Sequence, residues 1–144
     1  MGGAPRGDRG GSGPAELILD TDIISPVTGR PIDRARAGAG ARIGLAFPTV
    51  AELYYGAHKA EWGDARLADM EERIGECVVL QPEEDLARLC GVLRAEARRL
   101  GHPLHEPVHA NDLWIATCAV YHGLPLLTAN RRHFAKFPLL RLAD

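Results

Sequence analysis

The chain has 144 residues, 46% of them hydrophobic and 25% charged, with a formal net charge of -2 and a sequence pI near 6.3. This composition is typical of a single globular domain, and its weak negative charge excludes attraction of nucleic acid by the overall field of the molecule. No apolar run reaches the roughly 20 residues that a membrane-spanning helix requires. The three scattered cysteines, Cys77, Cys90 and Cys118, do not suggest a disulfide framework. We therefore expect a cytoplasmic protein with reduced, buried thiols and no membrane contact.

The first residues, MGGAPRGDRGGSGPA, are rich in glycine and proline and contain almost no apolar side chain that could be buried. They also lack the apolar centre of a secretory signal peptide. We interpret residues 1-15 as a disordered tail, or as the product of an early start codon, and expect one folded domain over residues 16-144.

Short apolar segments predict the strands, because buried strands of parallel sheets have this composition. The first segment, Leu17 to Leu19, ends on the carboxylate of Asp20, and turn-forming residues dominate residues 25-33 after it. The other predicted strands occupy residues 43-47, 77-80, 124-128 and 139-142.

Helical spacing of apolar residues occurs between these segments. The predicted helices occupy residues 49-60, 64-74, 82-100 and 111-122, with a short helical turn at 131-137. The predicted buried face of the longest helix comprises Leu86, Leu89, Val92, Leu93, Ala97 and Leu100. Gly101 and Gly123 are expected to end two of the helices, and Asn111 is expected to cap the start of the fourth. Strands that alternate with helices predict an α/β fold, with a parallel sheet covered by helices on both faces.

Three acidic residues occupy positions suited to chemistry, although each also has a structural explanation. Asp20 follows the first strand, where open α/β folds place ligands, but it could instead cap the next element. Glu52 forms a capping-box pattern with Thr49, and Asp112 complements the dipole in the first turn of its helix. Asp112, however, shares its side of the helix with apolar residues three, four and seven positions later, which the dipole alone does not require.

Three carboxylates that meet at one sheet edge would repel one another unless a hard divalent cation lies among them. Ligands that are all oxygen atoms favour Mg²⁺ or Mn²⁺ over zinc. Asp20, Glu52 and Asp112 therefore predict a magnesium site in which Mn²⁺ can substitute.

Three stretches carry a family resemblance: LDTDIIS, TVAELYYGA and NDLWIATCAVYHGLPLLTANRRHF, in this order across the chain. Together they resemble a PIN-domain ribonuclease of the VapC toxin type. The resemblance implies a three-layer α/β/α fold around a parallel sheet, Mg²⁺-dependent hydrolysis of RNA phosphodiester bonds, a homodimer, and inhibition by a cognate antitoxin protein encoded beside the toxin. It also implies that Asp20, Glu52 and Asp112 are the catalytic, metal-binding acids.

Lesser, substrate-orienting roles are predicted for a second set of residues, namely Asp22, Asn111, Thr128, Asn130 and Arg131. Many relatives carry a fourth acid at the position of Asn130, and an amide there adds no charge. We therefore expect one firmly bound ion and a second that is recruited by the substrate phosphate. Hydrolysis would proceed by metal-assisted attack of water, without a covalent enzyme intermediate.

Three other interpretations compete with this one. The missing fourth acid is compatible with a PIN-fold binding module that is weakly active or inactive. The stretch LDTDII also resembles the opening of haloacid-dehalogenase-type phosphatases, but the end of the chain lacks the pair of acids that such an enzyme needs. The spacing of His102, His105 and His109 suggests zinc, yet the prolines between them favour a solvated loop. These histidines, with His133 and nearby arginines, could instead contact RNA phosphates.

Overall fold

A computed structural model describes residues 13-24 and 40-144 of the chain. The predicted tail, residues 1-15, lies mostly outside this described part, and the turn-rich segment 25-33 lies wholly outside it. The strands in the described part are β1 (Leu17–Leu19), β2 (Ile43–Ala46), β3 (Val78–Leu80) and β4 (Leu126–Leu127). They form one parallel sheet in the order β3-β2-β1-β4.

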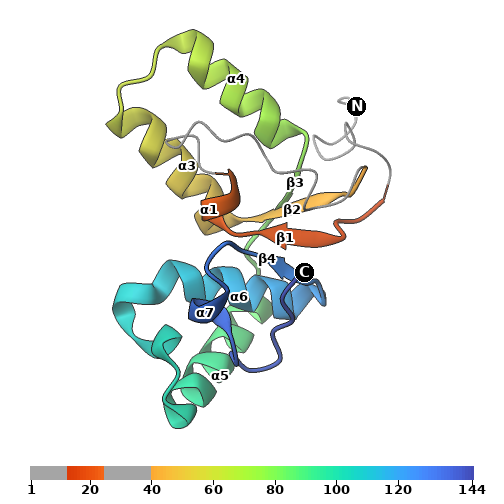
Figure 1. The fold of residues 1–144 in the computed structure, drawn as a ribbon, viewed down its shortest axis with the longest axis vertical. Coiled ribbons are helices and arrows are strands. Elements are labelled where there is room, and N and C mark those ends of the chain that lie inside the picture. The colour runs from red at the N-terminus through yellow and green to blue at the C-terminus, as the bar shows by residue number, and fades with distance from the viewer. Residues whose placement is uncertain (1–12, 25–39) are drawn as a thin grey trace.

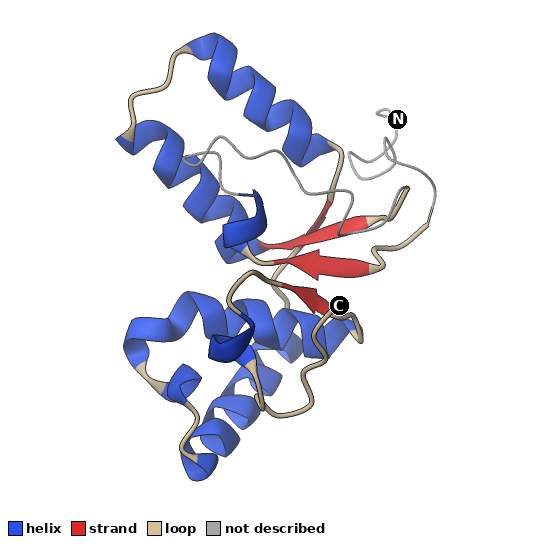
Figure 2. Ribbon diagram, in the orientation of Figure 1, coloured by secondary structure: helices blue, strands red, loops and turns tan. Residues whose placement is uncertain are grey.

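The strands alternate with helices, as the sequence predicts (Figures 1 and 2). The helices of the described part are α1 (Thr21–Ile24), α3 (Phe47–Lys59), α4 (Asp64–Gly75), α5 (Glu84–Leu100), α6 (Ala110–His122) and α7 (Arg131–Phe134), with two 3₁₀ turns, η3 (Pro103–His105) and η4 (Pro107–His109), between α5 and α6. In Figure 1, α3 and α4 lie on one side of the sheet, whereas α5, α6 and α7 lie on the other.

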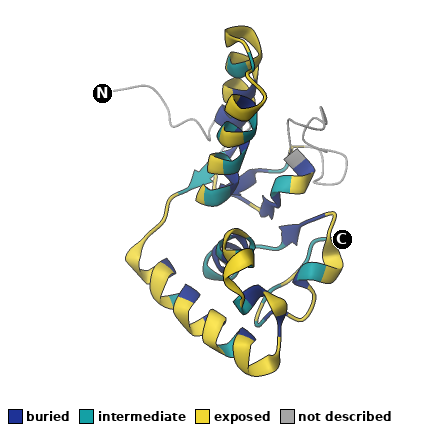
Figure 3. Cartoon of the chain, turned by 90° about the vertical axis from the view of Figure 1, so that its left-hand side faces the viewer, coloured by how far each residue is buried: buried dark blue, intermediate teal, exposed yellow. Residues whose placement is uncertain are grey.

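The two faces of the sheet bury different side chains, because successive residues of a strand point to opposite faces. Leu17 and Leu19 of β1 pack with Leu53 of α3 in one core. Ile18, between them, packs with Leu93 of α5 in the other core. Figure 3 shows the buried strands between helices whose outer faces are exposed. The predicted three-layer α/β/α architecture is therefore confirmed.

Two helix ends agree with the sequence and two helix starts do not. Gly101 and Gly123 end α5 and α6 with left-handed φ angles of 75° and 66°, a conformation that glycine adopts without steric cost. The start of α6 was predicted one residue too late, because the helix begins at Ala110 and Asn111 is not its cap. The capping box of Thr49 and Glu52 is also wrong, since α3 begins at Phe47 and the Thr49 hydroxyl accepts a hydrogen bond from Thr21 instead.

Two further predictions need correction. Val92 and Leu100 are exposed, because the buried stripe of α5 follows Leu86, Cys90, Leu93 and Ala97 at spacings of four, three and four residues. The predicted strand at residues 139-142 is reduced to a single parallel bridge between Leu126 and Leu142.

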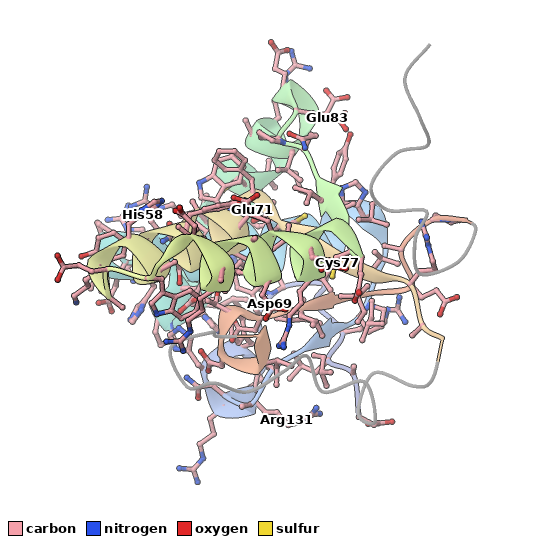
Figure 4. The ribbon with its side chains drawn as sticks, turned by 90° about the horizontal axis from the view of Figure 1, so that it is seen from above. His58, Asp69, Glu71, Cys77, Glu83 and Arg131 are labelled. Atoms are coloured by element: carbon pink, nitrogen blue, oxygen red, sulfur yellow. The ribbon has the colours of Figure 1, made fainter. Side chains whose placement is uncertain are left out.

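The three cysteines are buried thiols, as predicted. Figure 4 shows Cys77 just beyond α4, where the chain turns towards β3. None of the described helices has the length and apolar character that crossing a lipid bilayer requires.

Candidate active site

Asp20 is the buried centre of the site. It directly follows β1, and its side chain belongs to a residue that is only 3% exposed. Its Oδ2 atom accepts a hydrogen bond of 2.8 Å from the hydroxyl of Thr128, which directly follows the neighbouring strand β4. Its Oδ1 atom accepts a hydrogen bond of 2.8 Å from the backbone N–H of Thr21. The carboxylate is therefore held in one orientation at the carboxyl edge of the sheet.

Burial works against the negative charge of Asp20. The pKa of Asp20 is raised from 3.8 to about 6, chiefly because the carboxyl is removed from water. The charges of Asp22 and Asp112 contribute to this rise, whereas the hydrogen bonds from Thr128 and Thr21 oppose it. No described lysine or arginine forms an ion pair with this carboxylate. A cation bound at this edge of the sheet would offset the unfavourable burial of the negative charge on Asp20.

Glu52 is positioned by a residue from another helix. It lies in α3, and its Oε1 atom accepts a hydrogen bond of 2.8 Å from the side-chain amide of Asn111 in α6. Asn111 therefore orients Glu52 and directly precedes Asp112. Among the contacts of the described residues, none joins Glu52 directly to Asp20 or Asp112.

Asp112 is partly exposed and has a histidine partner. Its Oδ2 atom lies 2.9 Å from Nε2 of His133 in α7, and the two side chains are 34% and 17% exposed. Its charge acts on Asp20, which places the two carboxylates in the same neighbourhood. The predicted facing is confirmed, because Ile115, Ala116 and Ala119 on the same side of α6 are buried.

The remaining predicted residues lie around this edge in different ways. Thr128 acts on Asp20, and its hydroxyl also accepts a hydrogen bond of 3.0 Å from the backbone N–H of Asn130. Asp22 is exposed and contributes its charge to the field at Asp20. The guanidinium of Arg131, labelled in Figure 4, donates to the carbonyl of Ala143 near the end of the chain, so its recorded partner lies outside the acidic group.

The histidines form a different group from the one that their spacing suggests. Both ring nitrogens of His102 are engaged within the fold, Nδ1 with the N–H of Leu104 and Nε2 with the carbonyl oxygen of Ala135. These contacts exclude a zinc site built on His102, His105 and His109. The predicted solvated loop is wrong at His102, because this side chain is buried. His109 instead lies near Asp112 and His133, at the start of α6.

Sequence reasoning missed the role of His133 as a partner of Asp112. The signal was its place in the stretch ANRRHF, directly after Thr128, since a short helix at the end of β4 returns towards the same sheet edge. The sequence alone could not identify the atom it faces.

The residues present fit a hard divalent ion. Asp20, Glu52 and Asp112 offer carboxylate oxygens, the ligand type of Mg²⁺ and Mn²⁺. The buried Asp20 carboxylate has no ion pair with a described lysine or arginine, and its burial opposes its negative charge.

Comparison with known proteins gives consistent results. A family model for the PIN domain matches residues 17-139. Ribonuclease VapC2 of Haemophilus influenzae is 34% identical over 88% of this chain and 95% of its own length. A tRNA(fMet)-specific endonuclease VapC of Shigella flexneri is 32% identical over 90% of this chain and 97% of its own length. The crystal structure of DNA-bound VapBC from Salmonella typhimurium superposes with a TM-score of 0.76 and 31% identity, covering 91% of this chain and 98% of that one.

Proposed function

Because the chain belongs to the PIN-domain family and is a ribonuclease of the VapC toxin type, we propose that it hydrolyses RNA phosphodiester bonds with Mg²⁺ held by Asp20, Glu52 and Asp112. Nucleases of this family depend on metal ions. The observation that carries the choice of residues is the burial of the Asp20 carboxylate beside the charge of Asp112 without a described cation. Oxygen ligands support Mg²⁺, with Mn²⁺ as its substitute.

Each acid has a partner that fixes its position. The hydroxyl of Thr128 and the N–H of Thr21 each donate a hydrogen bond to one oxygen of Asp20. These bonds set the orientation of the carboxylate and therefore of the lone pairs that remain available to a ligand. Asn111 holds Oε1 of Glu52. A bound divalent ion would lower the pKa of a water molecule and stabilise negative charge on the phosphate oxygens. Glu52 is half-buried and is suited to accept a proton from water near the ion.

Thr128 and Asn111 thus act by positioning acids, which differs from the substrate-orienting role that the sequence predicts for them. We retain Asp22, Asn130 and Arg131 as residues that orient the substrate near the rim. The acidic rim needs the ion to attract phosphate, because Asp22 and Asp112 would otherwise repel it.

The phosphatase alternative is excluded by the family match over residues 17-139. A weakly active or inactive PIN-fold module is the alternative that the biochemical test must separate from the enzyme. Purified protein should cleave total bacterial RNA with Mg²⁺ or Mn²⁺, stop with EDTA, and recover when Mg²⁺ is added in excess. An Asp20→Asn variant purified in the same way controls for contaminating nucleases. Equal cleavage by wild type and this variant would refute the proposed function.

We also propose that a cognate antitoxin binds this chain and that the toxin is a homodimer. An apolar cavity of about 390 Å³ lies beside Asn111, and exposed Phe47 and half-buried Trp114 contribute to its wall. An antitoxin segment with apolar side chains fits this wall and would end beside Glu52. Co-expression with the neighbouring reading frame should give a complex without ribonuclease activity, and light scattering of the free toxin should give twice the mass of one chain.

A further inference from the structure

A cluster of His109, Asp112 and His133 lies at the exposed end of the acidic edge. One ligand atom from each residue lies within 4.8 Å of the other two. Asp112 Oδ2 and His133 Nε2 are already 2.9 Å apart, and the rings of His109 and His133 meet edge to face with centroids 4.7 Å apart. The cluster thus joins two imidazoles and one carboxylate from three elements: His109 ends η4, Asp112 lies in the first turn of α6, and His133 lies in α7.

The geometry is close to that of a bound transition ion. Zinc bonds of about 2.0–2.2 Å in a tetrahedral arrangement place ligand atoms about 3.3 Å apart. Asp112 and His133 are at this spacing or slightly closer, and the His109 ring would need to move by about 1.5 Å at most. Because neither ring nitrogen of His109 bonds to another described group, movement of this ring breaks no hydrogen bond. An ion bound by Asp112 and His133 would replace the hydrogen bond between them and release its proton.

The ligand set differs in kind from that of the proposed Mg²⁺ site. Imidazole nitrogen favours zinc, cobalt and nickel, whereas Mg²⁺ favours oxygen. We propose that His109, Asp112 and His133 form a second cation site that binds Zn²⁺ or a similar borderline transition ion. The binding does not depend on nuclease activity.

A second consequence rests on the proposed function. Asp112 belongs to both ligand sets, so a zinc ion held by the histidines competes for the carboxylate that the hydrolytic site needs. We infer that zinc occupancy suppresses Mg²⁺-dependent cleavage. The zinc site then acts as an inhibitory site that the acidic residues alone would not create.

Binding is tested on the metal-free full chain with Zn²⁺ calorimetry and with Co²⁺ as a spectroscopic probe. His109→Gln and His133→Gln should each weaken Zn²⁺ binding by at least about tenfold, because even changes around a metal ligand cost about 10- to 100-fold in affinity. His58→Gln is the matched control, since His58 is exposed in the last turn of α3 and is labelled in Figure 4 well away from Arg131 on α7. This control should bind Zn²⁺ as the wild type does.

The spectrum identifies the ligands. Co²⁺ in the wild type should give visible bands of a four- or five-coordinate ion without a thiolate charge-transfer band, and His109→Gln should lose those bands. A thiolate band would place the ion on a cysteine and overturn the proposal. Equal Zn²⁺ affinity of wild type, His109→Gln and His133→Gln would overturn it as well.

Cleavage assays then separate the two claims. At fixed Mg²⁺, the factor by which Zn²⁺ lowers the cleavage rate should be at least tenfold smaller for His109→Gln than for wild type or His58→Gln. Equal inhibition of all three proteins would overturn the inhibitory role. If none of them cleaves RNA with Mg²⁺ but Zn²⁺ binding still depends on His109, the proposed function fails and the zinc site stands.

Discussion

Asp20 and Asp112 are two carboxylates at the same edge of the sheet, but their surroundings differ. Asp20 is buried, fixed by hydrogen bonds from Thr128 and Thr21, and separated from water. Asp112 has a side chain that is 34% exposed and faces His133, which can itself bind metal. The inner carboxylate is held by two hydrogen bonds and its charge is opposed by burial, whereas the outer one is partly open to water.

This difference assigns distinct tasks to the two ends of the site. A buried carboxylate whose charge is opposed by its surroundings favours a bound cation over an empty site. An exposed carboxylate contributes less to stability, because water screens its charge. The inner end should therefore determine whether an ion binds, and the outer end should determine which ion binds.

The largest expected effect is the loss of the inner carboxylate. Asp20→Asn should lower RNA cleavage by at least about a hundredfold, the cost of removing one charge-stabilising group from an active site. Asp22→Asn is a matched control that removes an exposed charge two residues away and should cost much less. The initial rate of cleavage with saturating Mg²⁺ measures both. A similar loss in the two variants would show that burial does not distinguish the inner acid.

The stability of the metal-free protein should depend on pH through Asp20. Its folded pKa of about 6 exceeds the ordinary 3.8, so Asp20 favours the folded state in acid and this contribution is lost as the pH rises through 6. The full difference is about 3 kcal/mol at 1.36 kcal/mol per pKa unit. Between pH 5 and 7.5, the unfolding free energy of wild type should fall by about 1.4 kcal/mol relative to Asp20→Asn.

Urea unfolding in the presence of EDTA measures this difference. Added Mg²⁺ at pH 7.5 should then stabilise wild type and leave Asp20→Asn nearly unchanged. If the unfolding free energies of the two proteins differ by the same amount across the pH range, burial does not raise the pKa of Asp20.

The hydroxyl of Thr128 should matter next. Thr128→Val removes the donor to Asp20 and should reduce cleavage by about 10- to 100-fold, as for other residues that orient metal ligands. Thr117→Val is the control, because Thr117 is equally buried and its hydroxyl donates to the carbonyl of Leu113 within α6. Both variants should lose stability, but only the first should lose activity with a weakened affinity for Mg²⁺. Equal activity losses would indicate a general effect of core disruption.

The smallest effect is expected at the rim. Asn130→Asp restores a charge at an exposed position whose backbone N–H bonds to Thr128. An exposed charge pair contributes about 0.5–1 kcal/mol, so Mg²⁺ affinity should rise by about twofold to fivefold. Asn130→Ala should not raise it. Calorimetric titration with Mg²⁺ compares the three proteins, and unchanged affinity in Asn130→Asp would place this residue outside the reach of the ion.

The sequence revealed the inner end of the site better than the partners of its acids. Asp20 could be located because an apolar strand ends on it, and Asp112 because the apolar residues of α6 share its side. The bond from Thr128 to Asp20 spans 108 positions, and that from Asn111 to Glu52 spans 59. Such bonds depend on the strand order, which places β4 beside β1, and strand order is not readable from apolar periodicity.

The errors in the fold have local causes. Asn111 and Thr49 are residue types that often cap helices, but tertiary partners recruited both side chains, and the helices start elsewhere. Val92 and Leu100 are apolar but lie off the buried stripe of α5. The prediction counted apolar residues without their exact angular position on the helix and therefore included too many in the core.

The most direct test of the site is an anomalous difference map from crystals of the full chain loaded with Mn²⁺ in the absence of zinc. We predict a peak within bonding distance of the carboxylates of Asp20 and Asp112, with Glu52 beside it, and no such peak in Asp20→Asn crystals. A Mn²⁺ peak bound only by surface residues, with none beside the Asp20 carboxylate, would contradict the assignment of these acids as the metal site.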